Sequence, residues 1–393
     1  MTSASFKRLL LLVATAGVAA TAAGAQDETS GSPSWSLSGD AGPVVELYFD
    51  RNAGGGLAVP RVIELGGSAS VDLKASAPNL LFRTGLDAVA SAASPSTLDQ
   101  TDSVSASLLE MELSWLPAPA FAFRAGKLLR SLGLGQAGSP ADPFAVEAGQ
   151  GGFWGFEAEW TGGTALSALG ILSIDRAATQ GELPDPSRMD GGFVVKDDGG
   201  LLDGALGAYI EGDVERRAVA DLSIPVGGFL ASAEGGLAFP SKGGDPEGAI
   251  RACLQRSVDM GGLSAELGLA WRQSWPGRNA SQVALLADEV AVAAASGREP
   301  PFAPFGPYWG TSYGELTLAI DSEGVLSLSA GIDAEPTLAS VAWLLSAEAW
   351  AGNLRAYVDA TGSAGSDSSE FVTVAEAAGQ PALDLEVGVG ISF

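Results

Sequence analysis

Acidic side chains spaced two residues apart are the residues of this sequence best suited to chemistry. Glu110 and Glu112 form one such pair, and Glu157 and Glu159 form another. Residues i and i+2 of a strand project to the same side, so each pair could act as an acid and a base or bind a divalent cation. Because this spacing recurs in many segments, a charged wall along a water-filled space is the favoured interpretation. No catalytic residue is predicted.

A glycine-rich segment at residues 133–138 (GLGQAG) matches the G-x-G-x-x-G pattern of nucleotide-binding loops. Such a loop must open a helix whose N-terminus holds the pyrophosphate. Here residues 139–143 (SPADP) follow at once, and they cannot begin a helix of that kind. The pattern therefore predicts a glycine-rich end of a strand, and no cofactor is expected.

The residue counts exclude several classes of function. The sequence contains no histidine and one cysteine, Cys253, among its 393 residues. It therefore has no Ser-His-Asp triad, no His-based zinc site and no histidine pH switch. One cysteine cannot form an intrachain disulfide or a thiolate metal cluster. With 21 basic against 47 acidic residues, the formal charge is −26, which would repel nucleic acid.

The first 25 residues are predicted to be a secretory signal peptide. Lys7 and Arg8 precede an apolar stretch, and Ala23-Gly24-Ala25 supplies an A-x-A cleavage site. An uncleaved N-terminal anchor is the alternative. Cleavage after Ala25 predicts an exported protein whose single domain spans residues 26–393. That domain contains no uninterrupted apolar run near the roughly 20 residues that a transmembrane helix needs.

Apolar and polar residues alternate along most of the chain, as in strands with one apolar face. Near the C-terminus the alternating apolar residues are Leu383, Leu385, Val387, Val389, Ile391 and Phe393. Similar alternation occurs near residues 69–75, 109–115, 154–160, 206–211, 263–272, 315–321, 326–333 and 354–359. Clusters of Gly, Pro, Asp and Ser separate these segments and predict turns.

Two architectures would use such strands: a soluble sandwich that buries its apolar faces between two sheets, and a barrel with its apolar face in lipid. The polar faces hold both carboxylates and glycines, as a crowded aqueous lumen would. Aromatic residues lie near the ends of the apolar faces, where interfacial girdles are expected: Trp115, Trp154, Trp160, Trp271 and Phe393. A closed sheet also satisfies its backbone groups in hydrocarbon. We therefore predict an all-β fold, a transmembrane antiparallel up-and-down β-barrel.

The signal peptide, the alternating strands and the terminal Ile391-Ser392-Phe393 resemble bacterial outer-membrane β-barrel proteins of the porin type. Residues 123–130 (FRAGKLLR), followed by residues 133–144, are similar to a stretch found in several porin-like barrels. The resemblance implies an outer-membrane location, contact with outer-membrane lipid, and recognition of Phe393 by the barrel-assembly machinery. It indicates no subfamily, and it leaves a monomer or a homo-oligomer open.

We expect about 16–18 strands, since single-chain bacterial barrels have an even number. The candidates begin near Trp35, Val62, Asn79, Val104, Ala120, Gly152, Ala165, Leu202, Arg216, Gly228, Ala249, Gly262, Tyr313, Gly324, Thr337, Gly352, Glu370 and Ala382. Residues 133–151, 176–200 and 276–312 are interpreted as long loops. The third contains an alanine-rich segment, residues 283–295, that could form a short helix.

The polar faces are predicted to line a water-filled pore whose surplus of negative charge favours cations. The residues predicted to line it are Asp72, Glu110, Glu112, Arg124, Lys127, Arg130, Glu157, Glu159, Glu266, Arg272, Glu315 and Asp333. Arg124, Lys127 and Arg130 could oppose acidic residues across a constriction. Strict alternation puts Lys127 on the face opposite Arg124, so that arrangement requires a bulge at Gly126.

These expectations favour a passive channel for ions or small hydrophilic solutes, without catalysis, cofactor or bound metal. One alternative is a non-conducting barrel that acts as an adhesin or a structural protein. Another is a secreted soluble β-sandwich that binds carbohydrate. Conductance in a bilayer would separate the first two, and solubility without detergent would identify the third.

Overall fold

The computed structural model describes most of the chain, in 14 segments separated by gaps. These segments are residues 34–49, 62–93, 103–128, 153–163, 166–174, 189–197, 202–211, 215–241, 243–295, 310–322, 324–337, 339–365, 369–377 and 381–392. The predicted signal peptide, residues 1–25, and the terminal Phe393 lie outside them.

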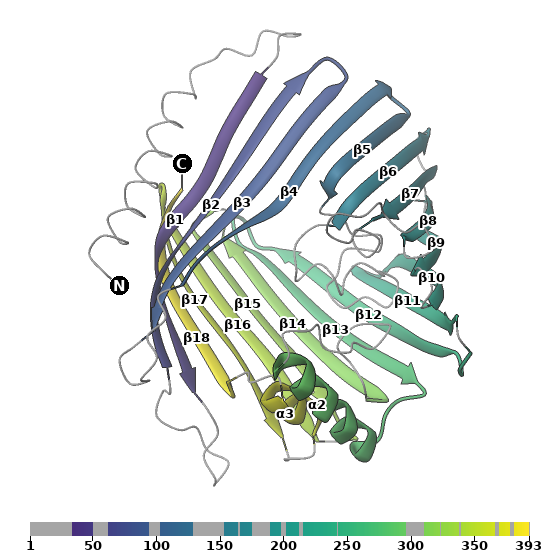
Figure 1. Cartoon of the computed structure of the whole chain (residues 1–393), viewed down its shortest axis with the longest axis vertical. Helices are drawn as coiled ribbons and strands as arrows, with labels where there is room; N and C mark the ends of the chain where they lie inside the picture. Colours follow the sequence, from purple (N-terminus) through teal and green to yellow (C-terminus); the bar gives the residue numbers. More distant parts are fainter. Residues whose placement is uncertain are drawn as a thin grey trace.

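The described residues form one sheet of 18 strands and two helices (Figure 1). The first nine strands are β1 (Ser34–Phe49), β2 (Val62–Ala77), β3 (Leu80–Ala93), β4 (Ser103–Ala118), β5 (Phe121–Leu128), β6 (Phe153–Gly162), β7 (Leu166–Ser173), β8 (Asp190–Asp197) and β9 (Asp203–Glu211). The others are β10 (Glu215–Val226), β11 (Phe229–Pro240), β12 (Glu247–Asp259), β13 (Ser264–Trp275), β14 (Ser312–Ser322), β15 (Leu326–Glu335), β16 (Ser340–Ala351), β17 (Leu354–Gly365) and β18 (Leu383–Ser392). The helices are α2 (Ala280–Ala295) and α3 (Glu370–Ala377).

The sheet closes on itself into a barrel. Each strand pairs antiparallel with the next one along the chain, and β18 pairs with β1 from Asp40 opposite Ser392 to Phe49 opposite Leu383. Closure leaves no sheet edge with unpaired backbone groups. The predicted antiparallel barrel of about 16–18 strands is confirmed, and the two-sheet sandwich is wrong.

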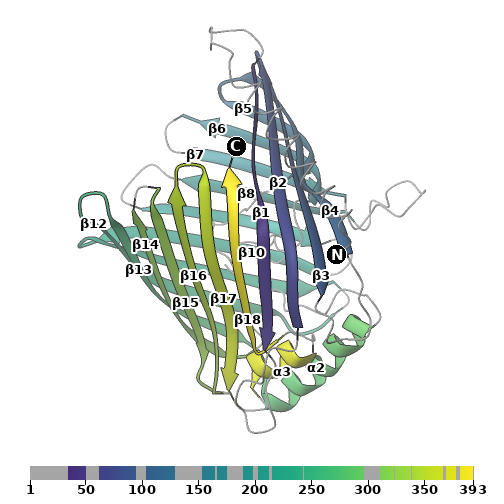
Figure 2. The same ribbon diagram turned by 90° about the vertical axis from the view of Figure 1, so that its left-hand side faces the viewer.

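The connections between strands alternate in length, which distinguishes the two ends of the barrel. The connections after the even-numbered strands contain two to five residues. One of them is the Gly227-Gly228 turn, whose φ values of 59° and 84° suit the left-handed turn of a tight hairpin. Most of the others are longer, up to residues 276–311. We call the two ends the short-turn end and the long-loop end; both helices lie at the long-loop end (Figure 2).

One face of the sheet is apolar and exposed, and the other carries charge. On β13, Leu267, Leu269 and Trp271 are 52%, 59% and 49% exposed, whereas Ala270 and Arg272 between and beside them are buried. In a closed barrel the crowded side is the inside, so the apolar face is the outer face. The predicted girdle residues Trp115, Trp154, Trp160 and Trp271 are all exposed there. Within the described residues, no helix is long and apolar enough to cross a membrane.

Two predictions of local structure were wrong. One predicted strand is a helix and one predicted loop contains a strand, so the predicted number of strands is unaffected. The segment that begins at Glu370 forms helix α3, although Val372, Thr373 and Val374 favour a strand by intrinsic propensity. Its packing against α2 and the barrel wall overrides that preference. Residues 176–200, interpreted as one loop, contain strand β8. The predicted helix in the third long loop is confirmed as α2, which begins at Ala280.

Placing a charge on the outer face should destabilise the folded barrel. Leu269 is 59% exposed and lies mid-strand between Leu254 and Leu316 on the neighbouring strands. We expect Leu269→Arg to lower the free energy of unfolding in lipid vesicles by about 2–4 kcal/mol, the cost of a cation near the bilayer midplane. Denaturant titration of tryptophan fluorescence measures it. Gln255→Arg, which adds the same charge on the inner face beside Glu266, is the control and should be nearly neutral. Equal losses in both variants would argue against a lipid-facing outer surface.

Candidate functional site

The charged inner face of the barrel is the candidate functional site. Strand register places ten of the predicted pore-lining residues on it: Asp72, Glu110, Glu112, Arg124, Glu157, Glu159, Glu266, Arg272, Glu315 and Asp333. These residues occupy alternate positions on their strands, opposite to the exposed apolar side chains. Their common placement follows from the period of two in each strand.

Lys127 does not join the other predicted residues. It lies opposite Met111 and Trp154 on the outer face, and its Nζ donates to the backbone oxygen of Leu108 at 2.5 Å. Pairing runs without a shift across Gly126, so the bulge needed to bring Lys127 to the face of Arg124 is not formed. A Cβ on Gly126 would stand 1.9 Å from the Met111 oxygen, which only glycine avoids. Arg130 lies outside the described residues.

Three adjacent strands, β4, β5 and β6, build a cluster around one guanidinium. The Arg124 Nη1 donates to Glu157 and, at 2.8 Å, to Glu159 Oε2, and its Nε lies 3.7 Å from Glu112 Oε1. Ser114 Oγ also donates to Glu112. Glu112 and Glu157 are only 1% and 3% exposed. We call these residues the Arg124 cluster; among the described residues it contains three carboxylates around one guanidinium.

The Arg124 cluster differs from the predicted constriction. Ser114, Arg124 and Glu157 are direct cross-strand partners on β4, β5 and β6. The guanidinium therefore pairs with carboxylates of its own wall rather than with acidic residues across the lumen. The two-residue spacing of Glu157 and Glu159 places both within reach of one arginine, which satisfies buried carboxylates that would otherwise be costly.

A second cluster lies on the wall formed by β11 to β14. Arg251 Nη1 lies 3.0 Å from Glu234 Oε1, and its Nε lies 2.7 Å from Glu315 Oε2. Arg272, the cross-strand partner of Arg251, is fully buried beside this Arg251 cluster. Sequence reasoning found Glu315 and Arg272 but missed Glu234 and Arg251. The alternation of Ala249, Arg251, Cys253 and Gln255 against Ile250, Ala252 and Leu254 on β12 was the available signal.

A third group surrounds Arg355 on β17. Its Nε lies 2.8 Å from Glu348 Oε1, and its Nη1 lies 4.0 Å from Asp40 Oδ2. The guanidinium carbon lies 4.8 Å from the ring centre of Tyr357 and 5.7 Å from that of Trp350. Cation–π contacts of this kind fix the orientation of the guanidinium. Carboxylates again outnumber the cation.

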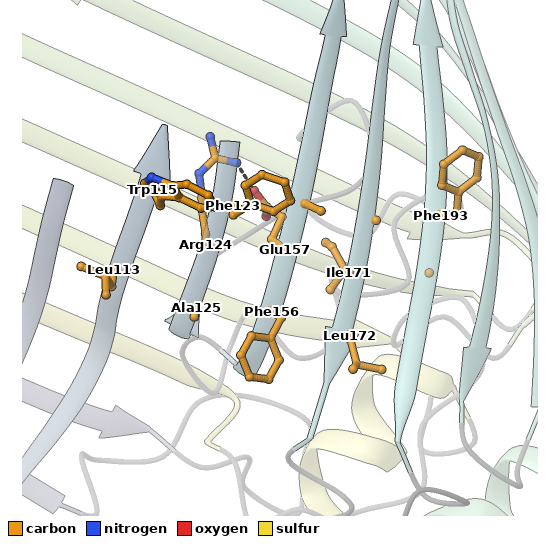
Figure 3. Close-up of a pocket in the computed structure, with 13 residues that line it drawn as sticks. Leu113, Trp115, Phe123, Arg124, Ala125, Phe156, Glu157, Ile171, Leu172 and Phe193 are labelled. Atoms are coloured by element: carbon orange, nitrogen blue, oxygen red, sulfur yellow. Dashed lines mark hydrogen bonds and ion pairs between the residues drawn. The ribbon is translucent and has the colours of Figure 1, made fainter. Parts of the chain in front are cut away.

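No group of three or more His, Cys, Asp or Glu side chains suited to a metal ion occurs in the part of the chain that the structure describes. An apolar hollow of about 580 Å³ lies on the outer face over β4 to β8 (Figure 3). Its lining includes Leu113, Trp115, Phe123, Phe156 and Phe193. The hollow therefore faces the medium around the barrel, and the polar chemistry of the protein belongs to the lumen.

Comparison with solved structures identifies the fold. No protein-family model and no curated protein matches the sequence. OccAB1 of Acinetobacter baumannii superimposes with a TM-score of 0.55 at 10% identity, covering 94% of this chain and 99% of that one. OccK5 (OpdH) of Pseudomonas aeruginosa gives 0.51 at 11% identity, covering 91% and 98%. The outer membrane protein OprD of the same organism gives 0.51 at 9% identity, covering 91% and 93%.

These three proteins are outer-membrane porins, channels rather than enzymes. At 9–11% identity the likeness establishes a shared fold, the 18-stranded antiparallel barrel. The predicted resemblance to porin-type barrels is confirmed at this level.

Removing the cation from the Arg124 cluster should destabilise the barrel strongly. Arg124→Met removes the guanidinium that pairs with the buried Glu112 and Glu157. We expect the free energy of unfolding to fall by about 3–5 kcal/mol, the usual cost of breaking a buried ion pair from one side. Adding Glu157→Gln should recover part of the loss, because one buried charge is then removed.

Urea-induced unfolding in detergent micelles or vesicles measures both variants. Arg216→Met is the matched control, because Arg216 is exposed on the outer face of β10 and should change stability by less than about 0.5 kcal/mol. A loss for Arg124→Met no larger than that of the control would show that the cluster contributes nothing to stability.

Proposed function

We propose that the protein is a passive outer-membrane channel for ions or small hydrophilic solutes. The observation that carries the proposal is a closed ring of 18 strands with charged clusters inside and exposed apolar side chains outside. Barrels of 16–18 strands are wide enough to leave an aqueous channel, unlike eight-stranded ones, whose interiors side chains fill. The fold shared with the outer-membrane porins supports the same reading. Transport through such a lumen requires no catalytic step.

The proposal includes export and orientation. A signal peptide cleaved after Ala25 delivers the chain across the inner membrane, and the assembly machinery recognises the terminal residue Phe393. In outer-membrane barrels the short turns are periplasmic and the long loops extracellular. The short-turn end therefore faces the periplasm, and the long-loop end, with α2 and α3, faces the outside.

We further propose that the channel favours cations. Three carboxylates surround Arg124, and Glu348 and Asp40 flank Arg355, so the inner wall keeps a negative surplus at both groups. Asp72 and Glu266 add exposed carboxylates to the same face. Fixed wall charge between low-dielectric walls attracts counter-ions and raises their local concentration.

Single-channel recording in planar bilayers under a salt gradient tests both parts. Steady ohmic steps with a reversal potential on the cation side are the expected result. Insertion without conductance would indicate a non-conducting adhesive or structural barrel. Conductance steps with a reversal potential on the anion side would overturn the proposed cation preference but support the proposed channel function.

Neutralising exposed carboxylates of the inner face should weaken the cation preference. We expect Asp72→Asn and Glu266→Gln each to lower the cation-to-anion permeability ratio by roughly two-fold, because a unit charge about 4 Å away contributes about 1 kcal/mol in water before salt screening. Reversal potentials at low salt measure it. Asp245→Asn, an exposed carboxylate between β11 and β12, is the control and should leave the ratio unchanged. Unchanged ratios in all three variants would place the selectivity elsewhere.

A further inference from the structure

Helix α3 is attached to the barrel by a buried carboxylate. Glu370, its first residue, is 1% exposed, and its Oε2 accepts hydrogen bonds from the Tyr313 hydroxyl and, at 2.8 Å, from the Gly310 backbone N–H. Tyr313 is fully buried, and its ring lies 6.0 Å from that of Phe371. A carboxylate that accepts two buried donors is a strong contact, because hydrogen bonds to a charged acceptor are stronger than neutral ones, and removing it breaks both bonds.

This contact is made inside the barrel. Tyr313 on β14 is the cross-strand partner of Arg272, and both project to the inner face. Glu335 on β15 and Ser340 on β16 are buried on the same side. A Cβ on Gly310 would meet Glu370 Oε2 at 3.0 Å and Glu335 Cγ at 3.1 Å, so these groups gather at one place. The N-terminus of α3 therefore rests against the inner wall at the long-loop end.

Helix α2 in turn packs on α3. Val283, Ala287 and Val290 form a buried stripe on α2 at the spacing of successive turns, and Val372 on α3 is buried as well. Asn279 Oδ1 accepts from the Gln282 N–H while Gln282 Oε1 accepts from the Asn279 N–H, which closes the start of α2 as a capping box. The position of α2 thus depends on that of α3 (Figures 1 and 2).

We propose that α2 and α3 form a lid over part of the lumen at the long-loop end, and that Glu370 is the positioning residue that holds this lid against the wall. The inference rests on the proposed channel function. Docked, the two helices narrow the entrance and set the largest solute that passes. Exposed Asp288 and Glu289 on α2 bring further negative charge to that entrance.

Breaking the contact should widen the channel. We expect Glu370→Ala and Tyr313→Phe each to raise single-channel conductance roughly two-fold and to admit larger neutral solutes, because each helix is about 10 Å across with its side chains. The double variant should match the larger single one, since both remove the same bond. Glu289→Ala, which removes an exposed carboxylate from the same lid, should leave the solute size limit unchanged.

Cysteine labelling reports docking without conductance. Ser369 is fully buried beside Glu370, so Ser369→Cys in a Cys253→Ser background should react slowly with a water-soluble maleimide. Adding Tyr313→Phe should undock the lid and raise the labelling rate about ten-fold, which is the population shift that a loss of about 1.4 kcal/mol produces. Circular dichroism confirms that each variant keeps its strands.

A disulfide then tests the lid by rescue. Ser369 Oγ and Ser340 Cα lie 2.5 and 3.0 Å from the point where a Cβ on Gly365 would stand, so the two serines are neighbours. The test protein carries Ser340→Cys and Ser369→Cys together with Glu370→Ala and Cys253→Ser. When its disulfide is oxidised, we expect the wild-type conductance. When the disulfide is reduced, we expect the higher conductance of Glu370→Ala.

Glu370→Ala and Tyr313→Phe could form intact barrels that keep the wild-type conductance and solute size limit. That result would overturn the proposed lid but not the proposed channel function. A reduced double-cysteine protein that conducts like the oxidised one would overturn it as well. If neither the wild type nor any variant conducts, the proposed function fails, and the role of the lid in solute size fails with it.

Discussion

Closure of the backbone hydrogen-bond ladder is the constraint on which the rest of the structure depends. An open sheet in hydrocarbon would leave two rows of unpaired N–H and C=O groups, each costing several kcal/mol. Pairing β18 with β1 removes both rows. Once the ring is closed, each strand must send alternate side chains inward and outward. The separation of apolar and charged residues into two faces follows from this geometry.

Many polar side chains of the inner face are carboxylates, and burying a charged carboxylate costs free energy unless it is hydrated or paired. Some of them, such as Asp72 and Glu266, are exposed and keep their hydration. Others are crowded by neighbours and lose that hydration. Arg124 and Arg251 compensate them by bridging two or three strands, so each arginine also ties the wall together. The carboxylates that outnumber these arginines are the basis of the proposed cation preference.

The long-loop end shows how a connection becomes part of the wall. The α2 connection leaves β13 and returns at β14, and α3 lies in the connection between β17 and β18. Tyr313 and Glu370 are 57 residues apart in sequence but share one hydrogen bond, and that bond joins the two connections. Buried valine and alanine side chains of α2 extend the contact. The two connections are therefore held together at the long-loop end by contacts of their helices.

The alternation of side chains by itself determined most of the strands and the polar side of each one, since a period of two is a local property of a strand. It placed Arg124, Glu157 and Glu315 on the polar side before any pairing was known. The glycine and aspartate clusters likewise located most of the turns. Only the tertiary structure decided which residues meet. Arg251 finds Glu315 two strands away through lateral register, and no bulge turns Lys127 inward. Helix α3, whose valines favour a strand, forms because it packs against α2 and the barrel wall. Strand β8 forms in a segment with little alternation because it pairs with β7 on one side and with β9 on the other. Such contacts join residues far apart in the chain, so no local pattern encodes them.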